Sequence, residues 1–187
     1  MKKIMFNDRY GLTQAVLKWQ KTVTRRIMNR QPDPDDIAYM EPKDYPCQPP
    51  YKVGEIVAVA QCYADIHSEL MIGDFGDDCY DSFKNAVVHD KAGWHNKMFV
   101  QADLMPHQIR ITSVRSERLQ DITDEDCMKE GIQVLDGRYY YRDSEGRIVD
   151  DFDNPRAAFA SLINKISGRG TWERNPFVWV YEFKLVK

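Results

Sequence analysis

Residues 18–27, KWQKTVTRRI, bring four basic side chains, two threonines and a tryptophan into ten positions. Lysine and arginine can bind a phosphate or stabilise a developing oxyanion. A threonine hydroxyl becomes a nucleophile when a neighbouring base takes its proton, and a lysine can be that base once burial or a cationic neighbour lowers its pKa. The segment therefore has the side chains either to bind an anionic ligand or to carry out acyl transfer.

Composition limits what the rest of the chain can be. A length of 187 residues suits one domain, and 43% apolar with 29% charged residues is typical of a soluble globular protein. The formal net charge is −3, so the protein as a whole is not a polyanion binder. Nucleic-acid affinity would have to come from a local basic patch, for which KTVTRR is the candidate. The alternative is that this charge cluster is simply a solvated face.

Hydropathy and cysteine spacing exclude several classes of protein. No stretch approaches the roughly 18 uninterrupted apolar residues of a membrane span, and polar residues interrupt the N-terminus at once. We therefore expect a cytoplasmic protein with no membrane partner. The four cysteines form no C-x-x-C pair and are predicted to be free thiols. The cysteines and histidines of residues 62–95 match no metal motif, so we expect neither a metal ion nor another cofactor.

Three helices are predicted from the spacing of apolar residues and from capping residues. Apolar residues recur with helical spacing in residues 11–20, and the β-branched residues that follow indicate an extended segment at 21–27. A second helix is expected at 123–131, where Thr123 can cap the first turn. The strongest helix pattern covers 154–168, with an asparagine cap, a proline at the first helical position and a closing glycine.

Strands are predicted at residues 3–6, 53–61, 107–119 and 175–186, with a hairpin over 138–149. Residues 29–52 are rich in proline and acid and indicate a surface excursion, and 62–97 lack clear periodicity. Strands and helices do not alternate regularly, so a doubly wound α/β protein is excluded. The pattern favours an α+β protein, with a mainly antiparallel sheet or small barrel and helices at its ends.

The last predicted strand carries aromatic residues at every second position. One face of it would hold four aromatic side chains, Phe177, Trp179, Tyr181 and Phe183. A packed face is the simpler interpretation. The alternative is a platform on which nucleobases stack.

Four segments in order resemble a known domain: QKTVTRR, YKVGEIVAVAQ, MPHQIRITSVRSERLQDITDEDCMKEGI and WERNPFVWVYEFK. Together they are similar to the ASCH domain of the PUA-like superfamily, in particular to its longer phage and prophage versions. The resemblance implies a small open β-barrel, mostly antiparallel, with flanking helices. It implies one domain over residues 1–187 with insertions at 29–50 and 62–97, and a nucleic acid or modified nucleoside as ligand.

The resemblance also implies roles for the basic segment. In the family the matching segment lines a cleft, and here it supplies four residues, Lys21, Thr22, Thr24 and Arg26, with Arg25 beside them. One branch hydrolyses the amide of N4-acylated cytidines with a lysine, a threonine and a glutamate. Those positions correspond to Lys21, Thr24 and Glu130. Glu130 could instead be an ordinary solvated residue near a helix end.

Two positions depart from the family pattern. Gln20 stands where arginine or lysine is frequent, and Gln61 stands where many relatives have glutamate. An amide can hydrogen-bond a base edge but cannot act as a base.

The first hypothesis is a module without chemistry that binds RNA, single-stranded nucleic acid or a modified nucleotide. It would hold phosphate through three residues, Lys21, Arg25 and Arg26, and contact a base through Gln61 and Tyr63. The second hypothesis is the amidohydrolase. The third is a protein-binding role for the acidic residues 73–82.

Overall fold

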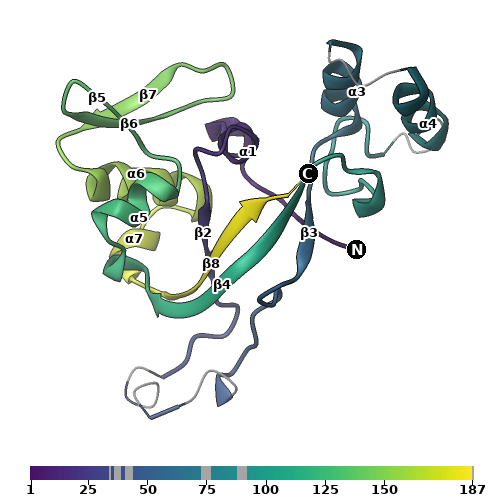
Figure 1. The fold of residues 1–187 in the computed structure, drawn as a ribbon. Coiled ribbons are helices and arrows are strands. Elements are labelled where there is room, and N and C mark those ends of the chain that lie inside the picture. Colours follow the sequence, from purple (N-terminus) through teal and green to yellow (C-terminus); the bar gives the residue numbers. More distant parts are fainter. Residues whose placement is uncertain (34, 36–38, 41–43, 73–76, 88–91, 187) are drawn as a thin grey trace. The chain divides into compact units, whose positions relative to one another are not determined.

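The computed structural model describes residues 1–33, 35, 39–40, 44–72, 77–87 and 92–186 (Figure 1). The chain forms two compact units. Unit 1 comprises Met1–Phe6, Ile56–Arg110 and Leu185–Lys187, and unit 2 comprises Asn7–Glu55 and Ile111–Lys184. Parts of both predicted insertions, residues 34, 36–38, 41–43, 73–76 and 88–91, lie outside the described residues, so only part of the acidic segment 73–82 is described.

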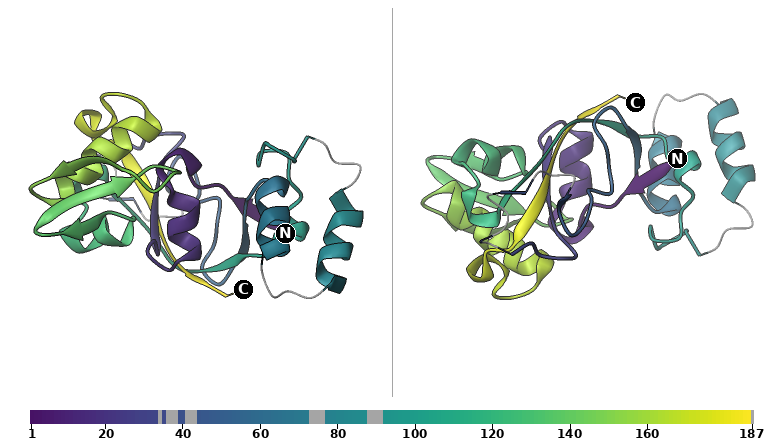
Figure 2. Two further views of the ribbon diagram at one scale, coloured as in Figure 1. Left: turned by 90° about the horizontal axis from the view of Figure 1, so that it is seen from above. Right: turned by 90° about the horizontal axis from the view of Figure 1, so that it is seen from below.

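The described residues of unit 1 form three strands and two helices. Strand β1 (Lys2–Ile4) pairs in parallel with β3 (Ile56–Val59), which pairs antiparallel with the start of β4 (Gln108–Arg118). Helices α3 (Tyr63–Ile72) and α4 (Asp77–Val87) lie side by side, and a short 3-10 turn spans Ala102–Leu104 (Figure 2). The hydrophobic core of unit 1 consists of Ala58, Ala60, Tyr63, Ile66, Leu70, Phe83, Val87, Val100 and Met105.

The two helices of unit 1 are more regular than the sequence indicated for residues 62–97. In α3 the buried side chains are Tyr63, Ile66 and Leu70, at positions i, i+3 and i+7. Polar residues crowd the positions between them, so the apolar stripe is narrow and its periodicity weak. Packing of this stripe against the rest of the unit, rather than intrinsic propensity, stabilises the helix.

Unit 2 contains a sheet in which β8 (Phe177–Leu185) pairs antiparallel with β2 (Val23–Ile27), and the remainder of β4 lies on the other side of β8. A second antiparallel sheet has the order β5 (Gln133–Leu135), β6 (Arg138–Arg142), β7 (Ile148–Phe152). Its described helices include α1 (Leu12–Leu17), α5 (Asp124–Lys129), α6 (Pro155–Ser167) and α7 (Thr171–Arg174), with 3-10 turns at Asp8–Tyr10 and Leu119–Asp121. Helix α6 packs against α5, α7, β6 and β7 (Figure 1).

The predicted helix starts in unit 2 are confirmed by their capping hydrogen bonds. Thr123 Oγ1 accepts from the Asp126 amide at 3.1 Å, and Asn154 Oδ1 accepts from the Ala157 amide at 2.8 Å. Each side chain satisfies an amide that would otherwise lack a partner at the helix start. The hairpin predicted at 138–149 is β6–β7. Strand β5 and helix α7 were not predicted, because each is too short to show a period.

The predicted fold class is confirmed: the protein is mixed α+β with mostly antiparallel strands, and only β1 and β3 pair in parallel among the described strands. The described strands form no closed barrel. None of the helices in the described part of the chain has the length and apolar character needed to cross a bilayer.

Candidate functional site

The register between β2 and β8 divides the basic segment between two faces of the sheet. Thr24 lies opposite Tyr181, and Arg26 lies opposite Trp179. Directly opposed residues share a face, and successive residues alternate between faces. These four residues therefore share one face, which we call the aromatic face, and Arg25 projects from the other.

The second face, the ion-pair face, holds Lys21 and Arg25 against α5. Lys21 Nζ donates to the Glu130 carbonyl at 2.8 Å and also contacts the Glu130 carboxylate. Lys21 and Glu130 are only 2% and 5% exposed. Arg25 donates to Glu130 Oε1 at 3.2 Å and to Asp126 Oδ2 at 2.7 Å. Glu130 is therefore a buried counter-ion, not a solvated helical residue.

Further charges from β4 and β8 complete the cluster. Arg25 Nε donates to Glu117 at 2.8 Å, while Arg115 donates to Asp126 and to Glu182, both at 2.6 Å. The ion-pair cluster thus has three cations and four carboxylates: Lys21, Arg25, Arg115, Glu117, Asp126, Glu130 and Glu182. The positive charge of Lys21 and Arg25 is balanced within the chain, as buried charges require.

Burial and neighbouring charges shift the pKa values of Lys21 and Asp126 within the ion-pair cluster. Loss of hydration lowers the pKa of Lys21 below its ordinary 10.5; Glu130 opposes this effect, and Arg26 and Arg25 add to it. Burial alone would raise the pKa of Asp126, but the hydrogen bond and charge of Arg25 and the charge of Arg115 hold it below 3.8. Lys21 therefore has the direction of pKa shift that a catalytic base needs.

Thr24 lies apart from the contact between Lys21 and Glu130. Its side chain is 5% exposed and lies on the aromatic face. In the described part of the chain, no hydrogen bond connects the Thr24 hydroxyl with Lys21 or Glu130. The structure thus brings together two of the three residues to which the resemblance gives catalytic roles.

Aromatic side chains pack closely on the aromatic face. Trp179 and Tyr181 are 3% and 0% exposed, and Trp179 Nε1 has no hydrogen-bond partner in the described part of the chain. Tyr45 packs on Trp179, with ring centroids 5.7 Å apart and planes inclined by 32°. Tyr51 meets Tyr181 edge-on at 5.4 Å. The expectation of a packed aromatic face is met by these contacts.

Arg26 is the cation of the aromatic face and is partly buried. Burial lowers its pKa, an effect opposed by Tyr51, Glu130 and Tyr181. Burial also raises the pKa of both tyrosines, and the charge of Arg26 opposes that rise. Arg26 and the two phenol rings are therefore close enough for their electrostatic effects to be mutual.

A pocket of about 320 Å³ adjoins this face. Tyr51 and Trp179 line it together with residues of β4 and of the segment before β3, namely Gln48, Pro49, Lys52, Val53, Val114, Arg115 and Ser116. Ser116 Oγ is hydrogen-bonded to the Tyr45 hydroxyl at 3.0 Å. The pocket combines aromatic and aliphatic walls with a few polar groups, which is typical of small-ligand sites.

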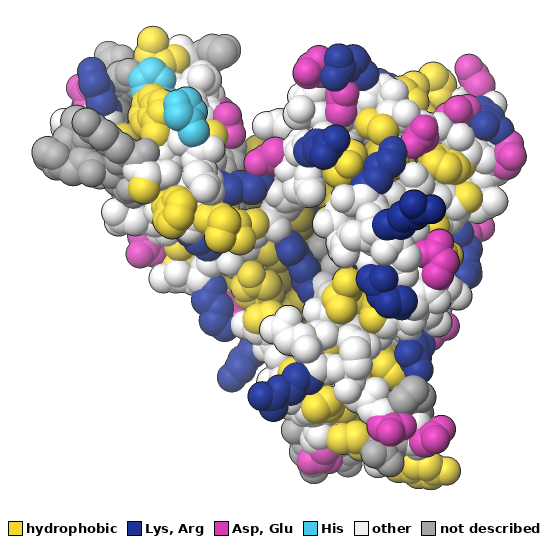
Figure 3. Space-filling model, turned by 180° about the vertical axis from the view of Figure 1, so that it is seen from behind, with side chains coloured by type: hydrophobic (Ala, Val, Ile, Leu, Met, Phe, Trp, Pro, Cys, Tyr) yellow, Lys and Arg dark blue, Asp and Glu magenta, His cyan; other side chains and the backbone are white. Residues whose placement is uncertain are grey.

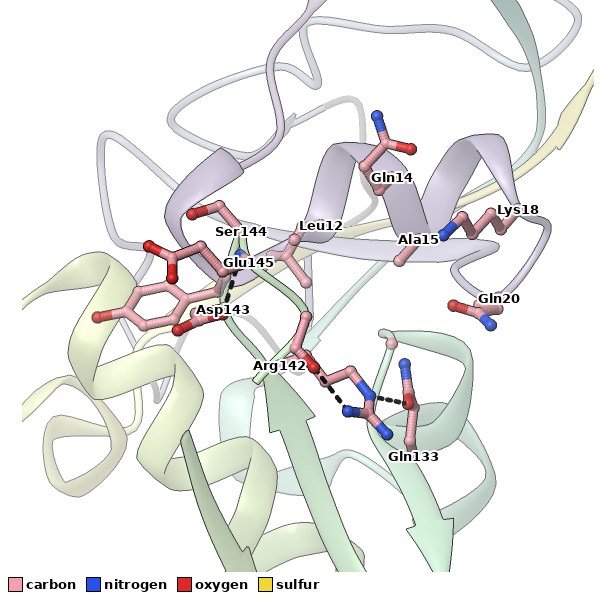
Figure 4. Close-up of a pocket in the computed structure, with 14 residues that line it drawn as sticks. Leu12, Gln14, Ala15, Lys18, Gln20, Gln133, Arg142, Asp143, Ser144 and Glu145 are labelled. Atoms are coloured by element: carbon pink, nitrogen blue, oxygen red, sulfur yellow. Dashed lines mark hydrogen bonds between the residues drawn. The ribbon is translucent and has the colours of Figure 1, made fainter. Parts of the chain in front are cut away.

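A second pocket, of about 290 Å³, lies between α1 and the turn of the β6–β7 hairpin (Figure 4). Arg142 points into it but donates to Gln133 at 3.2 Å and to the Gly146 carbonyl at 2.6 Å. Lys18 and Arg142 are balanced by Asp143 and Glu145 among the lining residues. Because the charged side chains of this second pocket are balanced within the chain, the pocket beside the aromatic face is the better candidate for a ligand site.

The surface provides no obvious alternative basic site on the face seen in Figure 3. Lys and Arg side chains there are spread among acidic, apolar and other side chains. Within the described residues, no group of three His, Cys, Asp or Glu side chains is placed to hold a metal ion. His89 lies outside those residues.

Gln61 and Tyr63, the predicted base-contacting residues, belong to unit 1. Gln61 Nε2 donates to Glu69 at 3.1 Å. Tyr63 has no exposed surface, and its hydroxyl accepts from the Gln101 amide at 2.9 Å. Tyr63 is therefore a core residue of unit 1.

Sequence reasoning did not single out Glu117, Asp126 or Arg115. One signal was present for Asp126, which precedes Glu130 by four residues and so lies on the same helical side. Another was the spacing of Arg115 and Glu117, two positions apart on a predicted strand, which places both on one face. The pairing of these residues with Arg25 depends on long-range packing.

No family model matches the chain, and no curated protein matches it. Among solved structures, it is similar to a protein of family DUF984 from Enterococcus faecalis V583, with 12% identity over 100% of this chain and 80% of the other, at a TM-score of 0.44. It is also similar to an ASCH domain from Lactobacillus crispatus JV V101, with 12% identity over 96% and 75%, at a TM-score of 0.38.

Proposed function

We propose that the protein binds RNA, another single-stranded nucleic acid or a modified nucleoside at the aromatic face of unit 2. The observation that carries the proposal is the position of Arg26 on one sheet face with Trp179 and Tyr181, next to a pocket of about 320 Å³. A guanidinium can bind phosphate or stack on a base, and aromatic rings provide the surface on which bases stack.

The proposed binding role falls to Arg26 rather than to the whole basic segment. Lys21 and Arg25 already donate to carboxylates of the ion-pair cluster, so neither offers a phosphate an uncompensated charge. Their part in binding is indirect, because they hold β2 against α5. Arg26 projects from the other face of β2, where aromatic residues surround it.

Replacing Arg26 by glutamine should weaken binding of a labelled ten-nucleotide single-stranded RNA by about tenfold, the effect of losing one hydrogen-bonded charge. Fluorescence anisotropy titration at several salt concentrations measures this, and the salt dependence of the variant should be shallower. Arg30→Gln removes the same charge from an exposed position four residues further along the chain, after β2, and serves as the matched control. Equal affinity of the two variants, or no binding by the wild type, contradicts the proposal.

A second candidate function is the hydrolysis of N4-acylated cytidine. The buried contact between Lys21 and Glu130 and the lowered pKa of Lys21 favour it. Thr24 would attack the acyl carbonyl while Lys21 takes the hydroxyl proton, and the proton would reach the departing cytidine amine. Water would then release the acyl group from Thr24. Because Thr24 lies on the aromatic face and Lys21 on the ion-pair face, this reaction requires the Thr24 hydroxyl to approach Lys21.

Incubation with N4-acetylcytidine, followed by liquid chromatography, tests the second candidate. If the three residues act together, the wild type releases cytidine and Thr24→Ala loses activity by about 10²-fold or more. Thr22→Ala, which removes the neighbouring threonine hydroxyl, should retain most of the activity. Absence of cytidine release by the wild type would exclude this reaction.

A further inference from the structure

Trp19 has a backbone conformation that tryptophan rarely adopts. Its φ angle is 60°, in the left-handed region that favours glycine, because a Cβ atom there comes too close to the following carbonyl oxygen. This conformation lets the Gln20 and Lys21 amides both donate to the Ala15 carbonyl, which closes the end of α1. Glycine would make the same turn without strain, so the turn itself does not require a tryptophan.

Packing does not account for the indole ring of Trp19 either. The residue is 59% exposed, whereas the other three tryptophans of the chain are buried or half-buried. Within the described residues, the indole takes part in no ring contact, cation–π contact or hydrogen bond. Backbone strain is typically retained where it serves function. A large aromatic side chain that is both strained and exposed therefore points to a contact with a ligand.

The chain neighbours of Trp19 indicate the chemistry of that ligand. Lys18 and Gln20 are exposed at the C-terminal end of α1, beside the second pocket (Figure 4). Lys18 makes no ion pair within the described residues, because the two acidic side chains of that pocket pair with Arg147 instead. An ammonium without a carboxylate partner attracts phosphate, and an indole ring stacks on any base. The combination of Lys18 and Trp19 fits a single-stranded nucleic acid.

A strand that occupies the aromatic face is long enough to reach Trp19 as well. Arg26 lies seven positions after Trp19, and seven residues span at most about 25 Å. Nucleotides spaced at about 3.4 Å cover that distance with roughly eight residues of nucleic acid. A ten-nucleotide strand can therefore contact both residues. A free nucleoside has one base and cannot stack on Trp19 while that base occupies the pocket beside the aromatic face.

We propose that Trp19 is a second contact for a single-stranded nucleic acid. Its indole stacks on one base of the strand while another nucleotide lies at the aromatic face, and Lys18 binds a phosphate beside the stacked base. The inference rests on the proposed function and names its ligand class, a strand of several nucleotides rather than a free nucleoside. Because every base can stack, Trp19 adds affinity without selecting a sequence.

Trp19→Gly tests this contact, because its two expected effects have opposite signs. The variant should bind the labelled ten-nucleotide RNA about fivefold more weakly or worse, the effect of losing one stacked base. Its melting temperature should rise by about 2–4 °C, because glycine removes the strain at residue 19. Trp19→Phe keeps a stacking ring and should retain more RNA affinity than Trp19→Gly. Adenosine monophosphate, with a single base, should bind the wild type and Trp19→Gly equally.

Phe99→Ala is the matched control, since it removes an aromatic ring that is 58% exposed from unit 1 and should leave RNA binding unchanged. Three results would overturn the inference while Arg26→Gln still supports the proposed function. They are equal RNA affinity of Trp19→Gly and the wild type, a lower melting temperature of Trp19→Gly, or the same loss of affinity for adenosine monophosphate as for RNA. If the wild type binds no RNA, the proposed function itself fails.

Discussion

Replacement of Glu130 by alanine is expected to lower the free energy of unfolding by about 3–5 kcal/mol. Glu130 is the shared counter-ion of Lys21 and Arg25, and both cations are almost fully buried. Without it, Lys21 loses its only carboxylate partner in the described part of the chain. A buried ammonium cannot recover its hydration without opening the structure, so the cost far exceeds that of a surface ion pair.

Urea unfolding followed by circular dichroism measures this loss, and Glu125→Ala is the matched control. Glu125 lies one residue before Asp126 on the same helix, its side chain is 76% exposed, and it pairs with Lys129. Its replacement should change stability by no more than about 0.5 kcal/mol. The double variant Lys21→Met/Glu130→Ala should lose less than the sum of the two single variants, because each partner is costly only when the other is left charged. A loss below 1 kcal/mol for Glu130→Ala would show that these charges are hydrated.

Replacement of Tyr63 by alanine is expected to destabilise the protein by about 3–5 kcal/mol. The ring fills the core of unit 1 and lies against Gly93, where an added Cβ would come within 2.4 Å of Tyr63 Cε2. Tyr63→Phe keeps the ring and removes the hydroxyl that accepts from the Gln101 amide, so its cost should be about 1 kcal/mol.

The same two variants decide whether Tyr63 contacts a nucleic acid, as the sequence suggested. Because the side chain has no exposed surface, Tyr63→Phe should bind single-stranded RNA with the affinity of the wild type. Thermal unfolding and anisotropy titration on one preparation give both quantities. Weaker RNA binding without a change in stability would show that Tyr63 reaches the ligand after all.

Local chemistry determined which parts of the fold could be predicted. The starts of α5 and α6 follow from Thr123, Asn154 and Pro155, whose effects act within one helical turn. Strand β2 follows from the β-branched residues that come directly after α1. Helix α3 was missed because its buried residues form a narrow stripe among polar ones, and only packing against the core of unit 1 distinguishes it from a loop.

The site was predictable to a smaller extent. Its residue types pointed to Lys21 and Arg26, and the resemblance linked Lys21 with Glu130. Alternation along the strand implied that Arg25 and Arg26 face opposite ways, but not which face holds acids and which holds aromatic rings. That assignment depends on Glu130 and Trp179, which lie more than 100 residues away in the chain. Burial of the basic segment could not be inferred from its own composition.

The ion-pair cluster also imposes an order on biosynthesis. Lys21 precedes Glu130 by 109 residues, and at about 5–20 residues per second roughly 5–20 s separate their synthesis. During that interval the segment KTVTRR is present without its acidic partners, and β2 has no neighbouring strand until β8 is made. Lys21 and Arg25 thus remain uncompensated on the ribosome until β4 and α5 supply Glu117, Asp126 and Glu130. Chains released before α5 would keep a basic segment without its acidic partners, and this is the feature in which they would differ most from the folded protein.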